Sequence, residues 1–347
     1  GNYAANIVVT DEDGQTTSDN ITISVTGNYP PEVSFSIPGN EQRFAANAVV
    51  DLKASASDQD GSIDKVEFYD GTTLLAIDNS APYEHTINGL SVGDHTLEAR
   101  VYDNVGATSE DYISISAVSI SAVDIGNTST APTIDGNVDA LWDSQTGYSI
   151  DNVVLGTING SSDLSGTWKA VWDATNLYVL IDVNDDNKIN DSGADFWLDD
   201  AVELYLDVNY DHQTSYGSDD YQLVVRYNDS QLYGNRTSGL NPVIAQADKS
   251  GGYRVEFAIP WADISGYSQQ SGVLLGIDVA INDDDDGGAR DKKIAWNTTT
   301  DNAHQDPSLF GAGKLTGDAP PPPTYTLTVN SGSGDGDYAE GSVVNIT

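Results

Sequence analysis

The sequence predicts an all-β chain of antiparallel β-sandwiches in tandem. Short stretches of alternating apolar and polar residues recur along it, separated by turn residues every 8–12 positions or so. No helical pattern longer than a turn or two interrupts them. The chain has 347 residues, which is too long for one sandwich and suits two or three domains.

Composition excludes several classes of partner. The chain has 14 Lys+Arg against 54 Asp+Glu, a formal charge of −40, so we expect no nucleic acid and no anionic membrane as partner. No run of about 18 apolar residues exists, so membrane insertion is not expected. Cysteine and methionine are absent, which excludes disulfides and zinc bound through cysteine. Gly1 is not a natural start, so the lack of a visible signal peptide does not decide the parent protein's destination.

The N-terminal segment, 1–27, reads as a hairpin around the turn at 11–14. Its few residues cannot bury a core of their own. The stretch NIVVTDEDGQTTSDNITISVTG resembles the last two strands of a PKD domain, which implies the C-terminal remnant of a domain cut at its N-terminus.

Residues 28–118 form the first predicted complete sandwich, after the linker Asn28-Tyr-Pro-Pro31. The expected strands are 33–37, 49–56, 64–69, 73–77, 84–87, 95–102 and 111–118. The motif DQDGSIDKVEFYDG and the sequence around it resemble the bacterial immunoglobulin-like domains that join modules in polysaccharide-degrading enzymes.

Residues 119–317 form the largest predicted domain and hold all six tryptophans. Its expected strands are 168–173, 177–183, 201–208, 221–227, 253–259, 273–281 and 292–296, and its only expected helical turns are 139–142 and 261–264. Four of these strands alternate between an apolar face and a polar one. If they share one sheet, the polar face is a floor formed by Glu203, Gln222, Arg226, Arg254, Glu256 and Asp278.

A Pro-rich linker and two strands, 318–347, close the chain. The stretch YTLTVNSGSGDGDYAEGSVVNIT resembles the start of a bacterial surface repeat of the internalin-B type. Both ends are therefore expected to continue into a longer modular protein.

Trp197 lies in an acidic loop that runs directly into the alternating strand 201–208. An exposed indole beside polar side chains on a rigid sheet suits a sugar ring, whose C–H face packs on the aromatic ring while its hydroxyls hydrogen-bond. The alternative is a tryptophan of the hydrophobic core.

The large domain resembles a family 9 carbohydrate-binding module. The motifs PTIDGNVDALWD (132–143), WKAVWDATNLYVLIDVND (168–185), FWLDDAVELYLD (196–207) and VEFAIPW (255–261) occur in that family's order and spacing. The resemblance implies a β-sandwich without catalysis, structural calcium and a site that clamps sugar rings between two tryptophans.

That resemblance assigns Trp197 to the first clamp position and Glu203 to the acidic residue of the next strand. The second clamp tryptophan is replaced by His304, and the asparagine that accompanies it by Asp301. The other four tryptophans of the family pattern, and Trp168 by its alternation with Trp172, are expected in the core. With the polar floor, the candidate sugar-binding residues are Trp197, Glu203, Gln222, Arg226, Asp301 and His304.

Two arginines on the predicted floor leave a choice open. Arg226 and Arg254 suit an acidic or sulfated sugar, because guanidinium matches carboxylate and sulfate bidentately. Alternatively, they pair with carboxylates on neighbouring strands.

Acidic residues crowd around two loops of the large domain, and such hard oxygen ligands favour calcium. The candidate metal ligands are Asp185, Asp186, Asn187, Asp191, Asp195, Asp283, Asp284 and Asp285. We expect a structural Ca²⁺ that stiffens the loop presenting Trp197.

The predicted function is non-catalytic binding of polysaccharide or oligosaccharide by a calcium-stabilised module. No catalytic triad, phosphate loop or histidine cluster appears, so this fragment is not expected to be an enzyme. We expect a monomeric fragment covalently linked to further domains of a secreted or cell-surface bacterial protein, whose parent is a glycan-degrading enzyme. The alternative is a structural or adhesive spacer that has lost sugar binding.

Overall fold

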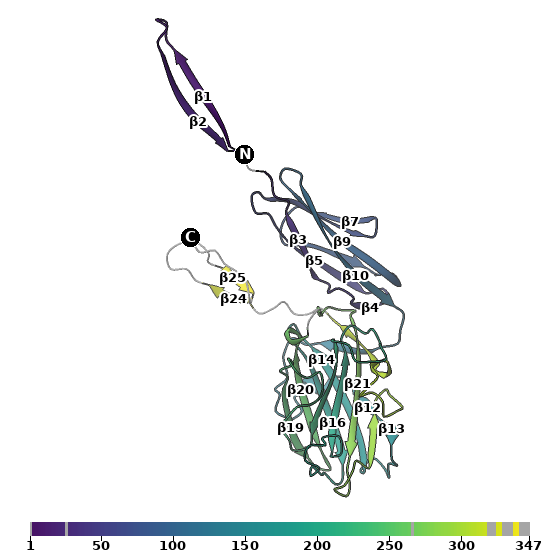
Figure 1. Ribbon diagram of the computed structural model, residues 1–347. Helices are drawn as coiled ribbons and strands as arrows, with labels where there is room; N and C mark the ends of the chain where they lie inside the picture. Colours follow the sequence, from purple (N-terminus) through teal and green to yellow (C-terminus); the bar gives the residue numbers. More distant parts are fainter. Residues whose placement is uncertain (1, 25–26, 265–266, 318–323, 328–335, 340–347) are drawn as a thin grey trace. The chain divides into compact units, whose positions relative to one another are not determined.

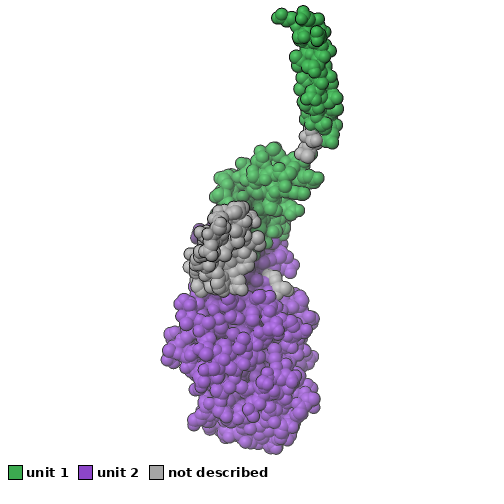
Figure 2. Space-filling view, turned by 90° about the vertical axis from the view of Figure 1, so that its left-hand side faces the viewer, with its two compact units in different colours: residues 1–36, 53–85, 97–112 green, residues 37–52, 86–96, 113–347 purple. Residues whose placement is uncertain are grey.

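The computed structural model describes residues 2–24, 27–264, 267–317, 324–327 and 336–339. Their regular structure is almost entirely strands (Figure 1), which confirms the predicted all-β class. Two compact units divide the chain (Figure 2): unit 1 comprises 1–36, 53–85 and 97–112, and unit 2 comprises 37–52, 86–96 and 113–347. Within the described residues, no helix has the length and apolar character to cross a membrane.

The N-terminal segment is a two-stranded antiparallel hairpin of β1 (Asn2–Thr10) and β2 (Thr16–Ser24). Its apolar side chains lie on an exposed ribbon; Val8 and Val9 are 57% and 60% exposed. This agrees with a segment that has no core of its own. Its origin in a PKD domain stays a prediction.

Two sheets form the immunoglobulin-like sandwich predicted for 28–118. One contains β4 (Arg43–Ala45), β10 (Thr108–Val118), β9 (Gly93–Asp103), β6 (Ile63–Asp70) and β7 (Thr73–Asp78), and the other β3 (Glu32–Ile37), β5 (Val49–Ser57) and β8 (Tyr83–Asn88). The rings of Phe35 in β3 and Phe68 in β6 meet across the sandwich, with centroids 6.1 Å apart. Strand β4 was not predicted, because three residues are too few to show an alternating pattern. It pairs with β10 in parallel.

The large domain has one 13-stranded sheet, in which ten strands form a continuous hydrogen-bonded path and three others pair beside it. They are β11 (Val123–Asn127), β12 (Tyr148–Ile150), β13 (Asn152–Leu155), β14 (Leu164–Trp172), β15 (Asn176–Asp185), β16 (Ala201–Asp207), β17 (Asp220–Arg226), β18 (Tyr233–Asn235), β19 (Val243–Lys249), β20 (Gly252–Pro260), β21 (Leu274–Asp283), β22 (Lys292–Ala295) and β23 (Gly311–Thr316). The helical turns are α1 (Ala140–Asp143), η1 (Trp261–Asp263) and η2 (Pro307–Leu309); the first two were predicted.

The two layers of this domain pack face to face. Strand order runs β18-β17-β16-β21-β23 in one layer and continues through β11 to β14-β15-β20-β19 in the other. A Cβ added to Gly166 in β14 would lie 2.4 Å from Cδ1 of Ile281 in β21, so the layers approach closely there. Apolar side chains that alternate along the strands fill the space between them, and Leu204, Val279 and Phe257 are fully buried.

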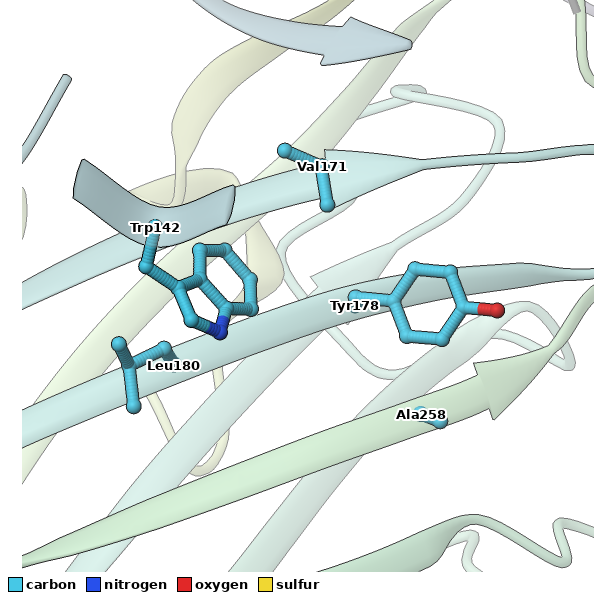
Figure 3. Packing of buried hydrophobic residues seen from close by; sticks show 5 residues of the cluster. All are labelled: Trp142, Val171, Tyr178, Leu180 and Ala258. Carbon is cyan, nitrogen blue, oxygen red and sulfur yellow. The ribbon is translucent and has the colours of Figure 1, made fainter. Parts of the chain in front are cut away.

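Five of the six tryptophans pack inside the domain, as predicted. Trp142, Trp168, Trp172 and Trp261 are almost fully buried, and Trp296 packs edge-on against Trp168 with centroids 4.9 Å apart. Turn α1 lays Trp142 over Val171, Tyr178, Leu180 and Ala258 (Figure 3).

The predicted polar floor is divided between the two layers. Strand β16 pairs with β17 and β21, but β20 pairs with β15 and β19 in the other layer. Glu203 and Gln222 therefore share one sheet surface, whereas Arg254 and Glu256 belong elsewhere. The strands belong to one sheet, but the assumption of one shared floor was wrong for β20, because alternation shows which residues share a face and not which strands are neighbours.

The C-terminal strands β24 (Thr324–Leu327) and β25 (Gly336–Ala339) form an antiparallel pair. The rest of the predicted internalin-B-type repeat and most of the Pro-rich linker lie outside the described residues.

Candidate functional site

Buried carboxylates from three strands meet at one end of the large domain. Asp185 ends β15, Asp200 precedes β16 and Asp283 ends β21, and one oxygen of each lies within 4.8 Å of the others. All three side chains are at most 2% exposed. Backbone N–H groups of Ile189 and Asp284 donate to Asp200, while Oδ1 of Asp283 is buried without a hydrogen-bond partner.

These carboxylates destabilise one another's ionised forms. Burial, together with repulsion from neighbouring aspartates, raises the pKa of Asp185 to about 6, of Asp283 to about 7 and of Asp200 to about 8. A divalent cation among them would stabilise the ionised forms, and all three offer the hard oxygen ligands that calcium prefers. The unpartnered oxygen of Asp283 fits such an ion.

Further acidic groups adjoin this cluster. Oxygens of Asp191, Asp199 and Asp284 lie within 4.8 Å of one another, and Asp284 also groups with Asp286 and Asp291. Oδ2 of the buried Asp284 has no hydrogen-bond partner.

A fourth grouping, of Asp163, Asp283 and Asp285, already contains a cation. Lys292 Nζ lies 2.7 Å from Asp163 Oδ1 and 2.9 Å from Asp283 Oδ2, and it also contacts Asp285. The single positive charge of Lys292 is shared among these three carboxylates, which leaves the other groupings as the candidates for a metal ion.

The structure brings five of the eight predicted metal ligands into these groups, and the binding of a metal stays a prediction. Asp185, Asp191, Asp283, Asp284 and Asp285 belong to these groups. Asp186 and Asp195 belong to none, and the Asn187 side chain instead donates to the carbonyl of Asp285 at 2.6 Å. We did not predict Asp163, Asp199, Asp200 and Asp291, which also belong to these groups.

A cavity of about 490 Å³ opens on the outer surface of β16 and its neighbours. It is lined by Phe196, Trp197, Glu203, Gln222, Asn235, Arg290, Lys293, Asp301 and His304. Trp197 is 46% exposed, unlike the buried tryptophans of the core. Thus five of the six predicted sugar-binding residues line one cavity, although β16, the 186–200 loop and the 296–306 segment are distant in the sequence.

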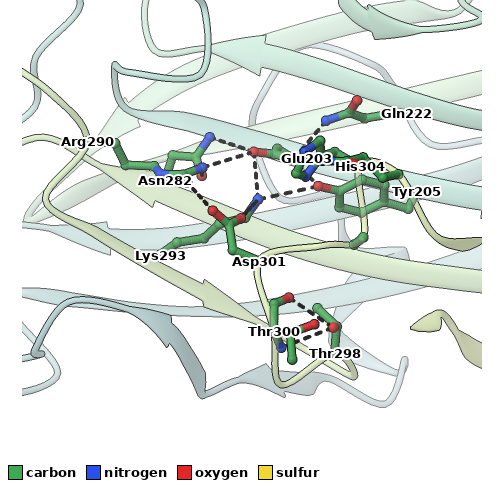
Figure 4. A network of polar contacts seen from close by, with 12 residues as sticks. Glu203, Tyr205, Gln222, Asn282, Arg290, Lys293, Thr298, Thr300, Asp301 and His304 are labelled. Carbon is green, nitrogen blue, oxygen red and sulfur yellow. Dashed lines mark hydrogen bonds and ion pairs between the residues drawn. The ribbon is translucent and has the colours of Figure 1, made fainter.

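Glu203 is the centre of the cavity floor (Figure 4). Its Oε1 accepts hydrogen bonds from Asn282 at 2.6 Å and Lys293 at 3.0 Å, and its Oε2 accepts from Gln222 at 3.0 Å and from the Tyr205 hydroxyl. Burial alone would raise its pKa, but Lys293, Tyr205 and Arg290 outweigh burial and lower the pKa to about 2. Glu203 is therefore an ionised carboxylate with four donors.

Asp301 completes a network of two acids and two bases. Its carboxylate contacts Arg290 and lies 3.0 Å from Lys293 Nζ, and Arg290 Nη1 donates to Asn282 at 3.0 Å. Glu203 and Asp301 balance Lys293 and Arg290, so this part of a very acidic protein carries no net charge. Asp301 is more exposed than Glu203 and faces the cavity.

The rim of the cavity is polar. Asn235 Nδ2 donates to Gln222 Oε1 at 3.0 Å and to the carbonyl of His304 at 3.1 Å. The imidazole of His304 lies 2.6 Å from the side-chain nitrogen of Gln305. These contacts join β17, β18 and the 302–306 turn around the opening.

The assignment of Arg226 to the sugar site was wrong. Its guanidinium donates to Asp199 at 3.0 Å, Asp229 at 2.6 Å and the carbonyl of Gly193 at 2.6 Å, so it braces the loop that carries Trp197. Arg254 pairs with Asp182 at 2.7 Å. Both arginines therefore pair with carboxylates of the protein, which is the second of the two alternatives.

Sequence reasoning missed four residues of the cavity: Phe196, Asn235, Arg290 and Lys293. One signal was available, because Lys292-Lys293 places two of only 14 basic residues side by side in a predicted strand. The position of β22 beside β21, which brings Lys293 to Glu203, is a tertiary contact that the sequence pattern does not contain.

Comparison with known proteins agrees with this architecture. Residues 134–318 match the family described as carbohydrate family 9 binding domain-like, and residues 31–99 match the bacterial Ig domain. The second match confirms the predicted immunoglobulin-like domain.

Individual relatives align with about half of this chain. Over 186 residues it is 37% identical both to endo-1,4-beta-xylanase A of Thermoanaerobacterium saccharolyticum and to exoglucanase XynX of Acetivibrio thermocellus. These alignments cover 54% of this chain but only 15% and 16% of the relatives.

A solved structure of a family 9 module from Caldicellulosiruptor kristjanssonii in complex with cellotriose is 27% identical. It aligns with 61% of this chain and all of that chain, with a TM-score of 0.49. Because the family match at 134–318 spans more than half of the sequence, the chain belongs to the carbohydrate family 9 binding domain-like family.

Proposed function

We propose that this chain binds the β-1,4-linked saccharides of plant polysaccharides through the Trp197 cavity, without catalysis, as one module of a larger secreted glycan-degrading protein. The main support for this proposal is the cavity, in which the half-exposed indole of Trp197 lies beside a network of hydrogen-bonding groups. An apolar ring surface with a few oriented polar groups suits a sugar, which has C–H faces and hydroxyl edges.

The relatives support the glycan class. Their names specify xylan- and glucan-cleaving enzymes, and the shared 186 residues are a small part of them. The enzymatic activity of the parent, its secretion and its further domains are extrapolated from those relatives. The domain boundaries after residues 27, 118 and 317 belong to the same proposal.

The cavity is suited to binding and not to glycoside hydrolysis. A general acid for that reaction requires a carboxyl with a raised pKa, whereas the pKa of Glu203 is lowered to about 2. Moreover, both Glu203 and Asp301 are paired with Lys293.

Xylotriose and cellotriose titrations, read by calorimetry, test this function. The wild-type chain should bind at least one of them, and Trp197→Ala should weaken that binding about thirtyfold, as for a hot-spot tryptophan worth about 2 kcal/mol. Tyr112→Ala removes an aromatic ring of similar exposure from the immunoglobulin-like domain and should leave binding unchanged. Absence of binding to both sugars would refute the proposal and favour the alternative, a structural or adhesive spacer.

We also propose that calcium is held by Asp185, Asp200 and Asp283, with a second candidate position at Asp191, Asp199 and Asp284. The buried unpartnered oxygens of Asp283 and Asp284 support this donor set. Bound Ca²⁺ would supply positive charge that offsets carboxylate repulsion and ties the 186–200 loop to β15 and β21. EDTA should therefore lower the Tm of the large domain and weaken glycan binding together; an unchanged Tm would argue against the site.

A further inference from the structure

Phe196, next to the platform tryptophan in the sequence, also faces the cavity. It lies on the cavity lining and is half-buried, whereas Phe257 and Phe310 of the same domain are buried in the core. Its ring centroid is 5.1 Å from that of Trp197, and the two ring planes are inclined by 83°. The two rings therefore form an aromatic corner.

Tyr233 supports this corner from the side. Its ring stacks on Phe196 with centroids 5.2 Å apart and planes within 20° of parallel. Arg226 lies 4.7 Å from the centroid of the Tyr233 ring and donates to its hydroxyl at 2.6 Å. Because Arg226 is itself held by Asp199 and Asp229, the stack is fixed to β17 and not only to the loop.

We propose that Phe196 is a second aromatic wall of the sugar-binding cavity, and that Tyr233 and Arg226 position it. The inference rests on the proposed function, because it assigns a further contact residue to the same cavity. A pyranose that packs its C–H face on Trp197 presents a ring edge with further C–H groups, and an inclined phenyl ring at the corner offers them an apolar contact. Phe196 contacts the sugar, while Tyr233 acts through Phe196.

The first experiment measures affinity for xylotriose and cellotriose in Phe196→Leu, Phe196→Tyr and Tyr233→Leu. Loss of one aromatic contact should weaken binding about two- to tenfold in Phe196→Leu. Phe196→Tyr keeps the ring and should restore most of the affinity, whereas Tyr233→Leu should give a smaller loss. Tyr102→Leu is the matched control, because Tyr102 also carries a cation on its ring face but lies in the immunoglobulin-like domain.

The second experiment detects contact directly. The chain has six phenylalanines, so 4-fluorophenylalanine labelling yields six ¹⁹F signals, and Phe196→Leu identifies the one from Phe196. Phe44, Phe68, Phe257 and Phe310 are buried, and Phe35 lies in the immunoglobulin-like domain. Titration with the bound trisaccharide should shift the Phe196 signal most.

The outcomes separate the two proposals. If Trp197→Ala abolishes binding while Phe196→Leu and the Phe196 fluorine signal are unaffected, Phe196 is no wall and only this inference fails. If Trp197→Ala leaves binding unchanged, or neither trisaccharide binds, the proposed function fails as well. A Phe196→Leu loss that Phe196→Tyr does not reverse would also overturn the inference.

Discussion

Replacing Lys293 with methionine tests the physical account of the cavity floor. Lys293 is 3% exposed and its ammonium lies 3.0 Å from both Glu203 and Asp301. Methionine keeps much of the volume but removes the charge. Glu203, at 2% exposure, then keeps only Asn282, Gln222 and Tyr205 as donors, with Arg290 Nη1 at 4.0 Å. Removing one partner of a buried ion pair costs about 3–5 kcal/mol.

Tryptophan fluorescence during thermal and denaturant unfolding is the suitable assay. All six tryptophans lie within 134–318, so the signal reports this domain alone. At about 2–4 °C per kcal/mol for a domain of this size, Lys293→Met should lower the Tm by about 6–20 °C. Lys314→Met is the control: the pair Lys314–Asp124 has a similar distance, 2.8 Å, but is exposed and should contribute less than about 1 kcal/mol.

A double-mutant cycle with Glu203→Gln separates the ion pair from packing. In the double variant both buried charges are gone, so it should be less destabilised than the sum of the single variants, by about 2 kcal/mol. Additive losses, or a loss below about 1 kcal/mol in Lys293→Met, would refute the interpretation of this network as a charge-balanced floor.

Three further predictions follow from the titrating and paired groups. Burial raises the pKa of Asp185, Asp283 and Asp200 to between about 6 and 8, so calcium binding should release protons and tighten as pH rises through that range. Calorimetry in buffers of different ionisation enthalpy would detect the released protons, and pH-independent binding would contradict the prediction. The pKa of Glu203 is about 2 in the folded state, below its unfolded value of about 4.3. Its contribution to stability is therefore present above about pH 4.3 and is lost as pH falls toward about 2. Glu203→Gln should make the free energy of unfolding less dependent on pH in this range, and an unaltered dependence would exclude this role of Glu203. Arg226→Met leaves the fully buried Asp199 without its cation, so it should lower the free energy of unfolding by about 3 kcal/mol and weaken glycan binding. Denaturant unfolding measures this change, and a decrease below about 1 kcal/mol would show that Arg226 does not brace the loop.

Local sequence patterns were sufficient for seven of the thirteen strands of the large domain and for five of the nine residues that line the cavity. Alternation along 201–207 separates Leu204 from Glu203 because successive residues of a strand point to opposite faces. Trp168 and Trp172, which alternate within an apolar strand, were correctly predicted as core residues. The acidic loop left the exposure of Trp197 open, and the family resemblance favoured the exposed position that the structure shows.

Strand neighbours were not readable in the same way. The sequence placed Arg254 beside Glu203 on one floor, but β20 pairs with β15 in the other layer, so Arg254 meets Asp182 instead. Hydrogen-bonding partners between strands depend on how the whole sheet path folds, and no periodicity within one strand encodes them.

The sequence by itself determined the fold class and the family. The tertiary structure decided which charges meet: Lys293 reaches Glu203 because β22 pairs with β21, and Arg226 turns to Asp199 instead of the cavity. The physical reason is that a buried charge pairs with the opposite charge nearest to it in space. Asp199 is 27 residues from Arg226 in the sequence, and Glu203 is 90 residues from Lys293.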